Sequence, residues 1–121
     1  MAMPAEVVDV VVGVDTRKHT HTAAVVSAST GGAVDEATVG TDPDGFEALV
    51  RMAEAHGGRR AWAVEGSGSH GAGLTRFLRE RGEWVVELDR PSRPARRNGA
   101  ESDSLDALRA AREALAREHP S

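Results

Sequence analysis

The feature that most constrains the fold is a nearly continuous run of β-branched residues from Val7 to Val14. The run is interrupted only by Asp9 and Gly13. A strand with one buried face alternates between apolar and polar residues, whereas this run is apolar on both faces. It therefore predicts a central strand that is covered on both sides of a sheet, and Asp15 follows at its carboxyl end.

Two further strands and a helix are predicted in the first half of the chain. The segments Thr20 to Ala28 and Ala33 to Thr41 have strand composition and are separated by a Thr-Gly-Gly turn signal. With the first strand they form an antiparallel meander. Asp42 is then placed as the N-cap and Pro43 as the first residue of a helix that stops at Gly57-Gly58.

The second half alternates between strand and helix patterns. A strand is predicted at Ala61 to Val64, a helix near Gly71 to Arg81 and a strand at Trp84 to Leu88. Such alternation implies parallel strands joined by crossover helices. A last helix is predicted from about residue 103 to Glu118, with an apolar stripe. The order indicates an α/β fold of the ribonuclease H-like type.

Composition predicts one domain, at residues 7–118, after a disordered segment at residues 1–6. The formal charge of −4 argues against a protein that coats nucleic acid by bulk charge. The absence of cysteine excludes disulfides and thiolate metal sites and agrees with a cytoplasmic protein. We expect neither a signal peptide nor a membrane span.

Four carboxylates occupy positions where a strand ends or a helix begins, and all four are candidate catalytic and metal-binding residues. They are Asp15, Glu65, Asp103 and Asp106. In the predicted order the strands that end at Asp15 and Glu65 are neighbours, and the last helix can bring its first turn to the same edge. Hard oxygen ligands from separate elements suit Mg²⁺ or Mn²⁺, and two such ions support phosphodiester chemistry.

Each of these carboxylates also has a structural interpretation. Asp15 can be a turn residue, Glu65 a solvated strand end, and Asp103 and Asp106 can stabilise a helix N-terminus. Spacing alone leaves both interpretations open. His19 and His21 alternate along a predicted strand, and we expect them to be surface polar residues rather than metal ligands.

A basic loop lies between the last predicted strand and the last helix. Its arginines are Arg90, Arg93, Arg96 and Arg97, with no acidic residue among them. Arginine matches phosphates bidentately, so the loop is a candidate contact with the backbone of DNA or RNA. No aromatic residue is interleaved with the arginines, so base stacking is not implied. The structural alternative is a solvated connector.

Four separated segments carry a family resemblance. In chain order they are Gly13 to Val26, Val64 to Gly71, Asp89 to Pro91, and Ser102 to Ala107. They resemble the DEDD-type insertion-sequence transposases, which are bridge-RNA-guided recombinases related to the Piv-type DNA invertases. The resemblance implies a RuvC-like N-terminal domain that binds Mg²⁺ or Mn²⁺ through the four carboxylates. It also implies DNA as substrate, a structured guide RNA as partner, and oligomers through the last helix.

The chain departs from the family pattern at several positions near these motifs. Arg17 stands where a His is common, His19 where an acid is common, His70 where a Tyr is common and Glu101 where a Lys is usual. Family members continue into a second domain with a serine nucleophile, to which nothing here corresponds. We therefore expect a truncated metal-binding half that does not complete recombination alone.

Two other functional classes are considered beside a transposase domain that acts on DNA. The first is a catalytically inactive truncated transposase that acts only as a nucleic-acid or subunit binding module. The second is an actin-like or sugar-kinase ATPase, since Gly13-Val14-Asp15-Thr16 also suits a first phosphate loop. That fold needs a second lobe and an adenosine pocket, for which 121 residues are too few.

Overall fold

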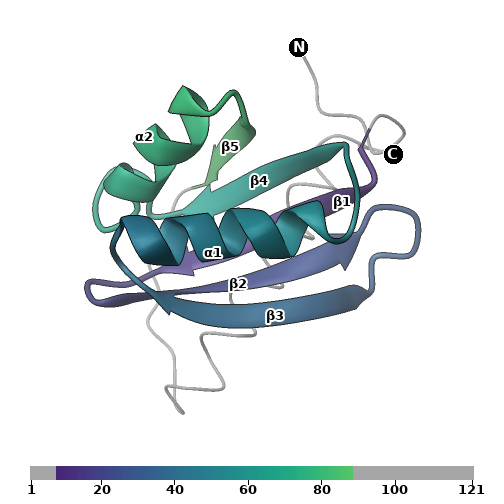
Figure 1. Ribbon diagram of the computed structural model, residues 1–121, viewed down its shortest axis with the longest axis horizontal. Helices are drawn as coiled ribbons and strands as arrows, with labels where there is room; N and C mark the ends of the chain where they lie inside the picture. The colour runs from purple at the N-terminus through teal and green to yellow at the C-terminus, as the bar shows by residue number, and fades with distance from the viewer. Residues whose placement is uncertain (1–7, 89–121) are drawn as a thin grey trace.

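One mixed five-stranded sheet organises the computed structural model, which describes residues 8–88. Its order is β3-β2-β1-β4-β5, with both described helices in front of it in Figure 1. The elements are β1 (Val10–Thr16), β2 (Thr20–Ser27), β3 (Ala33–Gly40), α1 (Pro43–Glu54), β4 (Arg60–Glu65), α2 (Ala72–Glu80) and β5 (Trp84–Leu88).

Strand β1 lies at the centre of the sheet and is buried along its whole length. It pairs antiparallel with β2 and parallel with β4, while β3 continues the meander and β5 runs parallel to β4. This arrangement confirms the predicted ribonuclease H-like order. Within the described residues the strand begins at Val10, since Asp9 is exposed and its backbone N–H donates to the carbonyl of Arg59, in the loop before β4.

Alternation along the strands produces two cores, one on each face of the sheet. On the helix face, Val12 and Trp62 pack with apolar residues of both helices, including Leu49 and Leu74. The other face is formed by smaller residues, with Val11 of β1 among them. Because both described helices cover the same face, side chains at odd positions of β1 and β4 point away from them.

Helix α1 begins as predicted. The Asp42 side chain accepts a hydrogen bond from the Gly45 N–H at 2.8 Å, and Pro43 occupies the first helical position. Gly45 packs directly against the Gly40 carbonyl at the end of β3, so a Cβ there would overlap that oxygen. The helix is thereby tied to the sheet at its first turn. Within residues 8–88, neither helix is long and apolar enough to cross a membrane.

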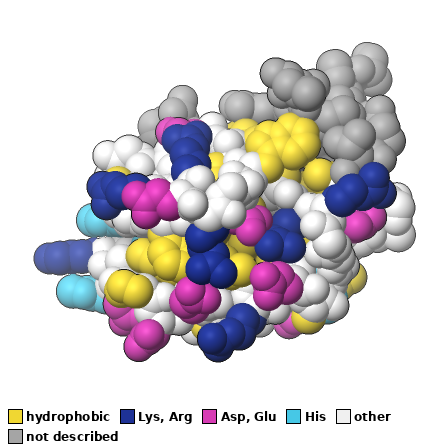
Figure 2. Space-filling model, turned by 45° about the horizontal axis from the view of Figure 1, so that its top comes forward, with side chains coloured by type: hydrophobic (Ala, Val, Ile, Leu, Met, Phe, Trp, Pro, Cys, Tyr) yellow, Lys and Arg dark blue, Asp and Glu magenta, His cyan; other side chains and the backbone are white. Residues whose placement is uncertain are grey.

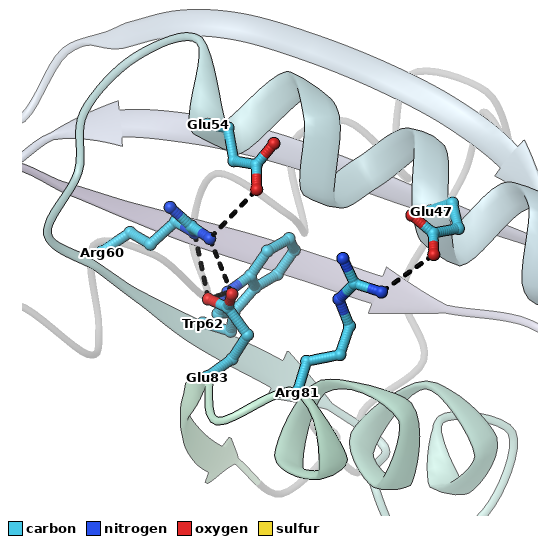
Figure 3. A network of polar contacts seen from close by, with 6 residues as sticks. All are labelled: Glu47, Glu54, Arg60, Trp62, Arg81 and Glu83. Atoms are coloured by element: carbon cyan, nitrogen blue, oxygen red, sulfur yellow. Dashed lines mark hydrogen bonds and ion pairs between the residues drawn. The ribbon is translucent and has the colours of Figure 1, made fainter.

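A polar network ties the beginning of β4 to the residue before β5 on the helix face (Figure 3). Glu83 accepts hydrogen bonds from Arg60 Nε at 3.0 Å, Arg60 Nη2 at 2.7 Å and Trp62 Nε1 at 2.8 Å. Glu54 at the end of α1 lies 3.8 Å from Arg60 Nη2. We refer to Glu54, Arg60, Trp62 and Glu83 as the Glu83 network.

Candidate metal-binding site

Asp15 and Glu65 are direct neighbours at the carboxyl ends of β1 and β4. They are paired in the parallel register of the two strands. Neighbouring strands are about 4.8 Å apart, and residues in register present their side chains on the same face. Asp15 is fully buried and Glu65 is 1% exposed. We refer to these two residues as the carboxylate pair.

The carboxylate pair lies on the face of the sheet opposite to α1 and α2. Asp15 follows Val11 and Gly13 in alternation, and Glu65 follows Ala61 and Ala63. The apolar residues of these two rows belong to the core on that face. The residues two positions before the carboxylates, Gly13 and Ala63, are small and buried. The apolar runs that predicted the strands therefore also determine on which face the carboxylates lie.

Thr16 and the loop after β4 fix the backbone around the carboxylate pair. The buried Thr16 hydroxyl donates to the Glu65 carbonyl at 2.7 Å, which ties the two strand ends together. Gly66 has a φ of 79°, and its carbonyl accepts from the N–H of Gly71. A Cβ on Gly71 would lie 2.8 Å from the Thr16 methyl group. The glycine loop is thus folded back against the end of β1.

Arg17 contacts the pair directly. Its Nε donates to Asp15 Oδ2 at 3.0 Å, and its side chain is 43% exposed while that of Asp15 is fully buried. The Arg17 N–H donates to the Thr20 carbonyl at 3.0 Å and to His21 Nδ1 at 3.3 Å. The sequence analysis did not predict that Thr16 joins the two strand ends or that Arg17 contacts Asp15. The spacing could have indicated Arg17, since positions i and i+2 of an extended chain share a face.

The prediction for His21 was wrong. Its ring is fully buried and stacks on Phe46 of α1, with 5.9 Å between centroids and 5° between planes. His19 precedes β2 and is exposed, as is His70 in the glycine loop. Alternation along a strand does not apply to His19 and His21, because β2 begins only at Thr20. His21 is therefore a core residue that supports the turn after β1.

The donor set of the carboxylate pair fits a hard divalent cation. Two adjacent carboxylates repel each other when both are ionised. A cation that prefers oxygen ligands, such as Mg²⁺, would offset that repulsion if it were bound between them. Among residues 8–88, no three His, Cys, Asp or Glu side chains form a cluster that could hold a metal ion. The structure therefore brings together two of the predicted ligands. Asp103, Asp106 and the arginines Arg90, Arg93, Arg96 and Arg97 lie outside the described residues.

On the helix face of the sheet, near the same strand ends, the carboxylate of Glu87 is bound by polar side chains of the chain itself. Glu87 of β5 accepts from the Ser67 hydroxyl at 2.7 Å and pairs with Arg79 at 2.7 Å. The hydrogen bond from Ser67, followed by that from Arg79, lowers the pKa of Glu87 below its ordinary value of 4.5. Acidic and basic side chains are interspersed over the face that Figure 2 shows.

Comparison with known proteins identifies a family for this arrangement. The model of the IS110-type DEDD family, described as "Transposase", matches residues 12–121. The match begins within β1 and takes in the carboxylate pair and every described element after β1. A search of curated proteins found no matching sequence. The family resemblance drawn from the four sequence segments is confirmed.

Proposed function

This chain belongs to the IS110-type DEDD transposase family, and we propose that it is the metal-binding, RuvC-like domain of a DNA transposase. The observation that carries the proposal is the register of Asp15 with Glu65, which brings two buried carboxylates side by side on central parallel strands. A divalent ion held by these oxygens would polarise a phosphodiester and stabilise the negative charge that develops during strand cleavage.

The roles of the chain's own residues follow from their positions. Asp15, on the central strand, and Glu65, on the neighbouring strand, would hold the ion with their carboxylate oxygens. The Thr16 hydroxyl holds the end of β4 beside that of β1, and this bond fixes the separation of the two strand ends. Gly71 allows the loop after β4 to close against Thr16. These contacts preorganise the pair, so that little rearrangement accompanies binding.

The remaining parts of the proposal concern residues 89–121. We propose that Asp103 and Asp106 complete the ligand set, so that four carboxylates serve the metal site. Arg90, Arg93, Arg96 and Arg97 are proposed to contact the phosphates of DNA or of a structured guide RNA. The apolar stripe of the last helix is the proposed contact between subunits. Mg²⁺ is the proposed metal, with Mn²⁺ as its experimental substitute.

Thermal unfolding with and without millimolar MnCl₂ or MgCl₂ tests the metal site. A ligand that binds only the folded state stabilises it by about 2.7 kcal/mol at a hundredfold excess over its dissociation constant. We expect the metal to raise the melting temperature of the native chain and not that of Asp15→Asn or Glu65→Gln. This readout does not depend on catalysis by other parts of a transposase.

Glu87→Gln is the matched control. Glu87 lies next to β4 at the same strand ends, but on the helix face, where Ser67 and Arg79 bind it. It undergoes the same chemical change and should keep the full metal-dependent stabilisation. If the native chain shows no shift, the carboxylates do not form a working site and a nucleic-acid binding module becomes the better proposal. A shift that persists in Glu65→Gln would place the metal elsewhere.

A further inference from the structure

Arg17 forms a hydrogen bond with one of the carboxylate oxygens that would bind the metal in the proposed site. Its Nε lies 3.0 Å from Asp15 Oδ2, within hydrogen-bonding distance. Asp15 is fully buried, whereas the Arg17 side chain is 43% exposed, so the guanidinium approaches the carboxylate from the solvent side. The charge of Asp15 is therefore already partly balanced by a group of the same chain.

The backbone holds Arg17 where this contact forms. The residue follows β1 directly, and its N–H is engaged by the Thr20 carbonyl and by His21 Nδ1. The ring of His21 is in turn fixed by stacking on Phe46 of α1. The side chain of Arg17 therefore starts from a defined point two residues beyond Asp15 and on the same side of the chain.

From this geometry we propose that Arg17 sets the affinity of the carboxylate pair for its divalent ion by competing for Asp15. The inference rests on the proposed function and deepens it. A guanidinium near a bound dication repels it, and the hydrogen bond to Oδ2 is weakened or lost when the ion coordinates that oxygen. Arg17 thus favours the metal-free state of Asp15 and raises the concentration of metal needed to fill the site.

The test compares metal affinity in the native 121-residue chain and in its Arg17→Gln variant. Each protein is titrated with MnCl₂, and free Mn²⁺ is followed by electron paramagnetic resonance, so no catalytic activity is needed. Because Arg17 is partly exposed, solvent and salt screen its charge, and we expect a three- to tenfold tightening, roughly, in Arg17→Gln at low ionic strength. Metal-free unfolding of both proteins confirms that the variant is folded.

Arg59→Gln is the matched control, because Arg59 pairs with Asp9 at the other end of β1, with 3.5 Å between Nη2 and Oδ1. This variant also loses one positive charge, but at a distance of about 20 Å from Asp15, given the usual rise per residue of a strand. Its affinity for Mn²⁺ should therefore equal that of the native chain. Equal affinity in Arg17→Gln, or weaker binding, would overturn the inference and leave the metal site standing. No binding by any of these proteins would overturn the proposed function as well.

Discussion

Carboxylates at the two ends of the parallel strands β1 and β4 have different neighbours. At the amino ends, Glu83 is enclosed by Arg60 and Trp62, and three hydrogen bonds from these residues satisfy its two oxygens. At the carboxyl ends, Asp15 and Glu65 are paired in register, so that two carboxylates are adjacent. The first arrangement surrounds one carboxylate with hydrogen-bond donors, whereas the second places two carboxylates next to each other, with Arg17 bonded to one of them.

On the proposed function, this difference separates a structural carboxylate from a metal-binding one. A buried acid that is surrounded by its own donors contributes to stability, and its removal leaves those donors without an acceptor. Two adjacent acids repel each other when both are ionised, and in the proposed function a cation offsets that repulsion. Burial alone does not distinguish the two cases. The presence of a second carboxylate in register does, and it gives the variants below opposite expected effects.

The largest effect is expected from Glu83→Ala. The substitution leaves the Trp62 indole N–H and the Arg60 guanidinium without their acceptor in a site where both ionic side chains are nearly buried, at 13% and 11% exposure. We expect a loss of about 3 kcal/mol in the free energy of unfolding, measured by urea denaturation.

Glu47→Ala is the control for that experiment. Glu47 also pairs with an arginine, Arg81, at 2.9 Å, but both side chains are exposed (Figure 3). Exposed pairs contribute at most about 1 kcal/mol. Equal losses in Glu83→Ala and Glu47→Ala would mean that the Glu83 network has no structural role beyond a surface ion pair, and the comparison between the two ends would fail.

The second effect concerns the glycine loop beside the carboxylate pair. In Gly71→Ala the new Cβ would lie 2.8 Å from the Thr16 methyl and 3.0 Å from the Gly66 carbonyl oxygen. We expect a loss of about 2 kcal/mol, because the strand end or the loop must move. In Gly73→Ala the nearest atom is 3.8 Å away in Phe46. That control should be neutral or stabilising, since alanine favours a helix.

How far the sequence could predict this molecule differs between these regions. The strands, the order of the sheet and the proximity of Asp15 to Glu65 followed from apolar runs, because local periodicity and the parallel crossover determine them. The Glu83 network was not predicted. It joins Trp62 to a residue 21 positions away, and no local pattern of apolar and polar residues records such a contact.

Errors at the edges of elements have the same origin. Periodicity placed His21 on the surface, but its burial depends on Phe46, which reaches it only after α1 has packed on the sheet. The pattern also ended the first strand before Asp15, whereas pairing with β2 and β4 extends β1 to Thr16. The ligands Asp103 and Asp106 and the arginine contacts stay predictions, since they lie outside the described residues.

The third prediction is a gain in the free energy of unfolding, whereas the first is a loss. In metal-free buffer at neutral pH, Glu65→Gln removes one of two neighbouring carboxylates without changing the volume of the side chain. We expect the free energy of unfolding to rise by about 1 kcal/mol, because the repulsion with Asp15 is relieved. Urea denaturation in the presence of a chelator measures it. A loss comparable to that of Glu83→Ala would show that Glu65 is a structural acid like Glu83.

The smallest effect tests whether face, rather than strand end, decides the role of a carboxylate. Glu87 lies at the same strand ends as the carboxylate pair, but it resembles Glu83 in being bound by its own chain. Its lowered pKa means that its contribution to stability is present above about pH 4.5 and is lost as the pH falls through the folded-state pKa. In Ser67→Ala the chief cause of that shift is removed.

We therefore expect the pKa of Glu87 to rise toward 4.5 in Ser67→Ala, so that acid destabilisation begins at a higher pH. NMR titration of the side-chain carboxyl carbon measures this directly. Ser69→Ala is the control, since Ser69 donates to the Gly66 carbonyl and not to Glu87. An unchanged pKa of Glu87 in Ser67→Ala would mean that Arg79 alone causes the shift. The hydrogen bond from Ser67 would then give no information about the role of Glu87. A rise would show that Glu87, like Glu83, is bound by donors of its own chain, and adjacent carboxylates on the opposite face would then remain the feature that distinguishes the proposed metal site.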